Sequence, residues 1–485
     1  MNPQIATAVY TLLIIGLFWL DREKKARTSA CLWFPVLWIL LACSRSVSQW
    51  LQLGVPIDSS DQVLEGSPVD RNVYMGLVAV GVIVLACRAR QLGKLLRGNP
   101  AVVVFFLYCL ISLVWSDYAE VAFKRWIKAL GDFIMVLIVL TDRDPAAAVR
   151  RVLARTSYLL IPLSLLFVKY YPELGKVYGR WDYKAYYTGV TTNKNALGAI
   201  CLLFGLASLW RFAAALREKQ IWQMITHGVI LGMVFWLFWM ANSMTSLSSF
   251  LLAFPLVLAA SRRAFIRRPA ALHLLAASVV AVSLFALFVA PSLLSTVGRD
   301  STLTDRTGIW EIALTLTPSP VVGTGFESFW LGGRLERMWA AYSWHPNQAH
   351  NGYLETYLNL GWVGVILLGG VMVSGYGHVL DAVRKKLPTA DLAFGYFVVG
   401  VVYNCTEAAF FRMTAPVWIF FLMAILKLPA VPRLATRLSA GTGDQRLTRP
   451  KPVNSVGWAG GKAEPEENPR LEPWVGAISA QGQCN

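Results

Sequence analysis

Residues 190–210 read VTTNKNALGAICLLFGLASLW, and this stretch decides the class of fold. After Lys194 it carries no charged side chain, and its length matches the roughly 20 residues that a helix needs to cross the hydrocarbon core of a bilayer. The whole chain has the same character, because 56% of its 485 residues are hydrophobic, only 15% are charged and the mean hydropathy is +0.50. Soluble domains usually carry about 25% charged residues. The sequence therefore predicts an integral membrane protein.

Similar apolar blocks recur along the chain as far as residue 429. A chain in lipid has to satisfy its backbone hydrogen bonds internally, so such blocks predict helices. We expect an all-α polytopic membrane protein with about 12–13 transmembrane helices, whose membrane domain covers residues 1–429. The tail, residues 430–485, is rich in Pro, Gly, Lys and Glu without periodicity, which predicts a disordered cytoplasmic extension. The expected spans are residues 5–20, 29–47, 72–87, 99–116, 127–141, 156–170, 190–210, 221–241, 244–260, 270–290, 353–377, 391–409 and 414–429.

The charge of the loops alternates along the chain. Loops after odd-numbered spans, such as residues 88–97 and 211–219, are short and basic, whereas the loop 48–71 is acidic. Cytoplasmic loops of membrane proteins are enriched in Lys and Arg, so the N-terminus is expected outside. The one large loop, residues 291–352, then also faces outward. Residues 1–20 lack a basic leader and a cleavage motif, so we interpret them as a retained first span.

Several functional classes find no support in the sequence. The net charge of +17 arises mainly from the short basic loops, which set membrane topology, so no nucleic-acid partner is expected. The seven cysteines show no CxxC pair or metal-ligand spacing. No P-loop, no GxGxxG after a strand and no Ser-His-Asp signature is present, so neither a nucleotide cofactor nor hydrolase chemistry is predicted.

Cations on the expected outer side are the informative exception to the charge pattern. They have no topological role there, and a convergent set of them suits a diphosphate-bearing ligand, because guanidinium groups bind phosphate bidentately. The alternative is that each extends to lipid headgroups at the interface. Lys194 opens an apolar helix, so its charge needs a partner. The outer cations are Lys124, Arg125, Lys128, Lys176, Arg180, Lys184, Lys194, Arg299, Arg306, Arg334 and Arg337.

Two histidines end the large loop, in the sequence WHPNQAHNGYLE (344–355). A histidine at such a position can be neutral near pH 7 and can then take a proton from a hydroxyl, which makes His350 a candidate base. Asn351 and Glu355 are close enough in sequence to orient its ring. A metal site is not expected, because Pro346 argues against one regular helix that carries both His345 and His350, and no cluster of carboxylates or cysteines completes a ligand set.

Four segments together resemble a known family. They are TTNKNALG (191–198), DRTGIWEIAL (305–314), PVVGTGFESF (320–329) and AHNGYLETYLNLGWVGVILL (349–368). In this order, gathered around one large loop, they resemble the O-antigen ligase and polysaccharide polymerase superfamily of bacterial inner membranes, which includes ExoQ-like exopolysaccharide polymerases.

The resemblance implies a GT-C-like helical fold and a metal-independent inverting glycosyltransferase without a cofactor, active at the periplasmic face of the inner membrane. The donor would be a glycan on undecaprenyl diphosphate, and the acceptor another glycan or lipid A core. His350 matches the family's catalytic base, and Arg306 matches an arginine assigned to the diphosphate. Lys194 and, less securely, Arg125 occupy basic positions of the family. Arg180 is added because it lies just before the Lys194 segment.

The residues leave several functions open. Ligase, polymerase and protein O-glycosylation ligase are not separated by these motifs, although the Lys-Asn segment favours a polysaccharide polymerase. Other polysaccharide assembly proteins are possible partners. A function of another class, a flippase or transporter of lipid-linked oligosaccharides, predicts charges spread through the spans. Here the charges gather at one face, with Asp132, Glu407 and Arg412 as exceptions whose place the sequence does not reveal.

Overall fold

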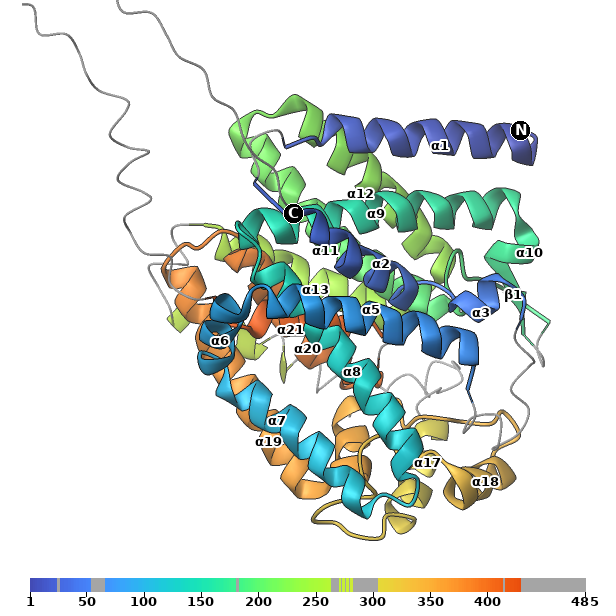
Figure 1. The fold of residues 1–485 in the computed structure, drawn as a ribbon. Coiled ribbons are helices and arrows are strands. Elements are labelled where there is room, and N and C mark those ends of the chain that lie inside the picture. The colour runs from blue at the N-terminus through green and yellow to red at the C-terminus, as the bar shows by residue number, and fades with distance from the viewer. Residues whose placement is uncertain are drawn as a thin grey trace, which may run out of the picture. The chain divides into compact units, whose positions relative to one another are not determined.

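The computed structural model describes residues 1–23, 27–53, 66–179, 183–262, 304–412 and 415–428, and residues 270–281 apart from 272, 275 and 279 (Figure 1). These residues are mostly helical, as predicted, and all but the tail belongs to one compact unit, Met1–Pro429. In the described ranges the only strands are β1 (Lys176–Tyr178) and β2 (Ala185–Tyr187), which pair antiparallel. The tail 430–485, most of the expected span 270–290 and Arg180 lie outside the described residues.

Six described helices are long and apolar enough to cross a membrane, so the prediction of a polytopic membrane protein is confirmed. A seventh span would arise from α6 (Ala89–Arg97) and α7 (Pro100–Ile111), which continues as the 3-10 turn η2 (Ser112–Trp115), although this pair is bent by 93°. Other expected spans are shorter helices, so the total of 12–13 stays a prediction. The six are α1 (Pro3–Leu20), α5 (Pro68–Ala86), α9 (Pro145–Tyr170), α11 (Lys194–Glu218), α12 (Ile221–Ala241) and α19 (Gly352–Arg384). The remaining elements are η1 (Ala30–Leu32), α2 (Trp33–Ala42), α3 (Val47–Trp50), α8 (Ala119–Leu140), α10 (Pro172–Gly175), α13 (Met244–Ala260), α17 (Thr304–Thr315), α18 (Gly332–Ala341), α20 (Ala390–Tyr403) and α21 (Val417–Ile425).

Several helices differ from the expected spans at their ends. Helix α9 begins at Pro145 rather than at residue 156, because Asp144 caps it by accepting a hydrogen bond from the backbone N–H of Ala147 (3.0 Å). Helix α8 begins at Ala119, so the cations expected at the start of a span lie on the helix itself. Hydropathy marks only the apolar part of a helix, and polar helical turns at its ends escape it.

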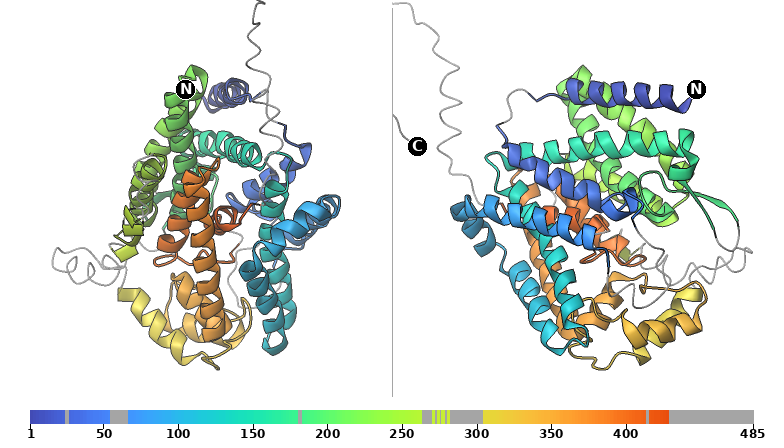
Figure 2. Two further views of the ribbon diagram at one scale, coloured as in Figure 1. Left: turned by 90° about the vertical axis from the view of Figure 1, so that its left-hand side faces the viewer. Right: turned by 45° about the vertical axis from the view of Figure 1, so that its right-hand side comes forward.

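Loops expected on the cytoplasmic side contact one another. The guanidinium group of Arg211, near the end of the span in α11, pairs with Asp21 (3.3 Å) and Glu23 (2.9 Å) after α1, and Arg150 of α9 also pairs with Glu23 (3.0 Å). Figure 1 shows α6 at the left, away from α3, α10 and β1 at the right. In both views of Figure 2, α1 lies along one edge of the helices and the yellow helices α17 and α18 lie together at the bottom. The basic helix α6 thus lies apart from α3, α10 and β1, and the inward or outward orientation of each loop stays a prediction.

Helix α19 carries a kink that holds the large loop in place. Gly361 adopts φ +63°, a conformation that costs little only for glycine. After the kink, the N–H of Trp362 donates to the carbonyl of Pro320 (2.9 Å) and that of Val363 to the carbonyl of Val321 (3.1 Å). The segment 320–322 is therefore docked against the interior of a helix that enters the bilayer.

We predict that Gly361→Ala destabilises the protein by at least about 2 kcal/mol, because a positive φ is strained for alanine. A change of this backbone angle would in turn disturb the hydrogen bonds that hold the segment 320–322. A Cβ atom at this position would lie 2.2 Å from the carbonyl oxygen of Val321. The measurement is thermal unfolding of the detergent-solubilised protein. Gly369→Ala is the control, because a Cβ there meets nothing within 4 Å on the same helix. Equal melting temperatures for the two variants would contradict the proposed role of the kink.

Candidate active site

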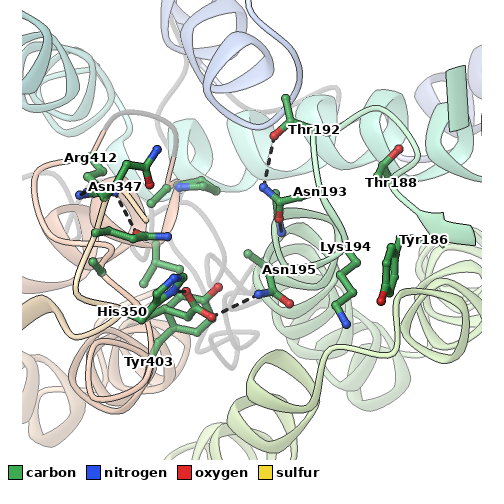
Figure 3. Close-up of a pocket in the computed structure, with 18 of the residues that line it drawn as sticks. Tyr186, Thr188, Thr192, Asn193, Lys194, Asn195, Asn347, His350, Tyr403 and Arg412 are labelled. Carbon is green, nitrogen blue, oxygen red and sulfur yellow. Dashed lines mark hydrogen bonds and ion pairs between the residues drawn. The ribbon is translucent and has the colours of Figure 1, made fainter. Parts of the chain in front are cut away.

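Three segments that are distant in sequence line one cavity of about 530 Å³ (Figure 3). They are the β2–α11 connection with the first turn of α11, the residues just before α19, and the connection from α20 to α21. Figure 3 shows His350, Asn347 and Arg412 on one wall and Asn193, Lys194 and Tyr186 on the other. The polar and charged residues that line the cavity include Thr188, Thr192, Asn193, Lys194, Asn195, Asn347, Gln348, His350, Glu407 and Arg412.

His350 is held at the entrance to α19. The next residue, Asn351, is the N-cap of that helix and accepts hydrogen bonds from the N–H groups of Tyr353 (3.0 Å) and Leu354 (3.1 Å). The N–H of Gly352 donates to the carbonyl of Asn404 (2.8 Å), which anchors the helix start to the end of α20. His350 itself has φ +50°, and its side chain is about one-fifth exposed. The imidazole is thereby directed to the cavity from a fixed backbone.

Glu407 connects three parts of the site. One carboxylate oxygen lies 3.1 Å from His350 Nδ1, and the other lies 3.3 Å from Asn195 Nδ2 and 3.6 Å from Arg306 Nη2. Arg306 also donates to the carbonyl of Thr406 (2.6 Å). A carboxylate accepts, so Nδ1 is assigned as the protonated ring nitrogen of His350. Nε2 is then the free acceptor, which is the state that a general base requires.

Lys194 and Arg412 supply positive charge to the same cavity. Lys194 is the first residue of α11, where Asn193 caps the helix by accepting from the N–H of Ala196 (2.9 Å). Its ammonium group lies 4.7 Å from the centre of the Tyr186 ring, a cation–π contact that answers the need for a partner. The guanidinium group of Arg412 donates to Gln348 Oε1 (2.9 Å). One imidazole and two cations therefore line the same cavity.

Part of the chain is similar in sequence to known proteins. Residues 190–369 match the family model described as O-antigen ligase. The exopolysaccharide production protein ExoQ of Rhizobium meliloti (strain 1021) is 28% identical over 307 residues, which cover 60% of this chain and 68% of ExoQ.

The chain is similar to the O-antigen ligase and ExoQ-like superfamily. The resemblance expected from the four motifs is confirmed. The long apolar helices and the similarity to ExoQ also agree with a multi-pass membrane protein. The matched O-antigen ligase segment contains Lys194, Arg306 and His350, and it ends before Glu407 and Arg412.

The residues predicted to bind the diphosphate do not all lie at the cavity. Lys194 lines the cavity, and Arg306 reaches its edge through Glu407. Arg125 lies on α8 and donates to the carbonyl of Glu327 (2.6 Å), so in this structure it holds the backbone of the large loop. Arg180 lies outside the described residues.

The two residues expected to orient His350 have other partners. Asn351 caps α19, as described above. Glu355 is buried one turn into the helix, where its carboxylate accepts from Trp330 Nε1 (2.9 and 3.0 Å) and the N–H of Ala349 (2.6 Å) and lies 3.5 Å from Arg412. This corrects the expectation: sequence proximity placed both residues near the ring, but the start of α19 at Gly352 turns both side chains to the helix cap and the loop. Glu407 is the residue that contacts His350.

Glu407 and Arg412 were noted from the sequence only as charges without a place. They lie 57 and 62 positions after His350, beyond the end of α20, and no local pattern connects them with it. The available signal was physical: ionisable residues at the edge of membrane spans are costly and are usually functional. The expected span 391–409 placed Glu407 inside a helix. In the structure α20 ends at Tyr403, and Glu407 lies in the connection that follows.

The two loop histidines have separate environments. His345 stacks on the ring of Trp339 with centroids 4.5 Å apart, whereas His350 contacts Glu407. Within the described part of the chain, no group of three or more His, Cys, Asp or Glu side chains is arranged to hold a metal ion.

Proposed function

We propose that this protein is a glycosyltransferase that moves a glycan from undecaprenyl diphosphate to an acceptor hydroxyl in surface polysaccharide biosynthesis, as a polymerase or a ligase. The proposal includes a GT-C-like fold in the bacterial inner membrane, with the large loop and the active site on the periplasmic side. The observation that carries it is the pair of His350 and Glu407 (3.1 Å) in a cavity that Lys194 and Arg412 also line.

The proposed reaction is a single metal-independent displacement. Nε2 of His350 takes the proton of the acceptor hydroxyl as its oxygen forms a bond to the anomeric carbon of the donor. The bond from that carbon to the phosphate oxygen breaks, and its electron pair leaves with undecaprenyl diphosphate. Attack from the side opposite the leaving group inverts the anomeric centre. Glu407 stabilises the imidazolium ion that forms and keeps the ring in one tautomer, as a triad carboxylate does.

The cations serve the leaving group in this proposal. Charge develops on the bridging oxygen of the diphosphate, and fixed cations in a partly enclosed site stabilise that charge. Lys194 and Arg412 approach the cavity from opposite walls (Figure 3). Arg306, assigned to the diphosphate by resemblance, also fixes Glu407. Arg125 and Arg180 stay proposals for the same ligand.

A transporter is less well supported by the arrangement of charges. Two of the three charges that the sequence could not place, Glu407 and Arg412, belong to the cavity. The third, Asp132, is fully buried in α8 and accepts a hydrogen bond from Trp38 Nε1 (2.7 Å). These three charges therefore do not trace a path along the spans.

We predict that Lys194→Gln and Arg412→Gln each raise the KM for the lipid-linked donor by roughly 10- to 100-fold, the range expected when a hydrogen bond to a charged group is lost. The measurement is initial transfer rate against donor concentration in proteoliposomes. Arg337→Gln is the control, because Arg337 is exposed on α18 and does not line the cavity. A donor KM that stays within twofold of the wild type in both variants would remove these residues from the donor site.

The experiment that tests the function supplies purified protein in proteoliposomes with an undecaprenyl-diphosphate repeat unit, with and without lipid A core. A ladder of longer lipid-linked glycans without lipid A core identifies a polymerase. Glycan attached to lipid A core identifies a ligase. Movement of the intact lipid-linked glycan across the bilayer, with no new glycosidic bond, would overturn the proposal in favour of a transporter.

A further inference from the structure

The large loop has a hydrophobic cluster of its own, which contains most of the aromatic side chains in the described part of the loop. The cluster includes Ile309, Phe329, Trp330, Leu335 and Met338, all buried. Flat aromatic faces suit sugar rings, but side chains such as Phe329 and Trp330 are buried here. Burial in the cluster removes them from any ligand.

Three tryptophans of the loop are fixed by their indole N–H groups. Trp310 donates to the carbonyl of Ala349 (2.8 Å) and Trp339 to the carbonyl of Pro346 (3.1 Å), while Trp330 donates to Glu355. A buried indole N–H normally needs such a partner, and these three residues therefore shape the loop. Two of these bonds end just before His350, at Pro346 and Ala349, and Glu355 in turn accepts a hydrogen bond from the N–H of Ala349.

Trp344 differs from these three. It is 43% exposed, it is not part of the hydrophobic cluster of the loop, and it does not belong to the described lining of the cavity. Its ring lies 6.4 Å from the ring of His350, with an angle of 40° between the planes. Thus His350 borders the charged cavity and also has an exposed aromatic side chain beside it.

The position of Trp344 is set by its neighbours. The next residue, His345, has φ +56° and stacks on Trp339 with centroids 4.5 Å apart and planes 12° from parallel. Trp339 also holds the carbonyl of Pro346. The chain on the C-terminal side of Trp344 is thereby fixed, so the exposed ring is presented from an ordered segment, which lowers the entropy cost of binding to it.

We infer that Trp344 is the platform for the sugar ring of the acceptor, so that donor and acceptor meet His350 from different sides. This rests on the proposed function. The diphosphate of the donor belongs with Lys194 and Arg412 in the cavity, where the positive charge is. The acceptor carries hydroxyls and C–H faces but no charge that the reaction requires, and an exposed indole beside the base suits it. A ring seated on Trp344 brings its hydroxyl to Nε2 of His350.

The test measures acceptor KM and donor KM separately in proteoliposomes for Trp344→Ala, Trp344→Phe and wild type. The acceptor is the repeat-unit oligosaccharide released by mild acid from the host's lipid-linked pool, and the donor is the undecaprenyl-diphosphate repeat unit. We expect Trp344→Ala to raise acceptor KM about tenfold and to leave donor KM within twofold, since an aromatic contact contributes up to roughly a tenfold change. Trp344→Phe keeps a ring face and should recover most of the loss.

Trp239→Ala is the matched control, because Trp239 is 76% exposed on α12 and has no place in the site. Unchanged acceptor KM in Trp344→Ala, or an equal rise in donor KM, would overturn the inference and indicate an interfacial anchor. A wild-type protein that transfers nothing at any acceptor concentration is a different failure, because it overturns the proposed function and this inference with it.

Discussion

Transfer should fall by about 10²- to 10⁴-fold in His350→Ala, the range that a general base contributes, while the donor still binds with unchanged affinity. His350 contacts Glu407 through Nδ1, and Nε2 is the only basic ring position left for the acceptor hydroxyl. His350 has a φ of +50°, which asparagine tolerates better than alanine does. His350→Asn is therefore a second variant, which separates a loss of chemistry from a loss of folding. The measurement is single-turnover transfer with donor bound in advance.

Two controls accompany this prediction. Free imidazole should restore part of the transfer in His350→Ala, because it can occupy the vacated space and take the proton. His378→Ala removes another histidine of α19, whose Nδ1 lies 3.1 Å from the carbonyl of Ile425, and its transfer per folded molecule should match the wild type. Wild-type turnover in both His350 variants would refute the assignment of the base.

Glu407→Gln should lower kcat by on the order of 10³-fold with little change in donor KM. The carboxylate accepts from His350 Nδ1 and is 8% exposed, so an amide in its place can donate to the ring and favour the tautomer that is protonated on Nε2. The same replacement of a triad carboxylate costs about 10⁴-fold in serine proteases. The measurement is the separate determination of kcat and KM by steady-state kinetics.

Glu407→Asp should recover part of the activity, because the negative charge remains. Asn195→Ala is the matched control: it removes a 3.3 Å contact with the other carboxylate oxygen and leaves the charge in place, so we expect a loss of only a few-fold. If Glu407→Gln raised donor KM and kept kcat, Glu407 would belong to the binding of the donor rather than to the base.

The apolar blocks of the sequence predicted most of the helices, because burial in lipid leaves a strong hydropathy signal. The start of α11 at Lys194 also followed from the polar run before it, in which Asn193 became the cap. The signal failed where helices extend beyond the apolar region, as at Pro145 in α9, and where an apolar block ends in a turn, as after Tyr403. Capping and tertiary contacts decide whether a polar segment continues a helix and whether an apolar segment ends in a turn. Hydropathy carries no information on either.

Part of the candidate site was predictable, because some of its residues are polar side chains next to apolar blocks of the sequence. His350 and Lys194 are polar residues at the starts of apolar helices, and the structure places both at one cavity. Glu407 was beyond reach, since its contact with His350 joins residues 57 positions apart and depends on how α19 packs on α20. Glu355 was misassigned because a helix turns its side chain away from the residue five positions earlier, towards Trp330.

The most direct test of the account is the coupling between bond formation and release of the carrier lipid. Purified protein in proteoliposomes, loaded with an undecaprenyl-diphosphate repeat unit and an acceptor oligosaccharide, should release one undecaprenyl diphosphate for each new glycosidic bond, and His350→Ala should stop both together. Glycosidic bonds formed without release of undecaprenyl diphosphate, or release at the wild-type rate from the His350→Ala protein, would contradict it.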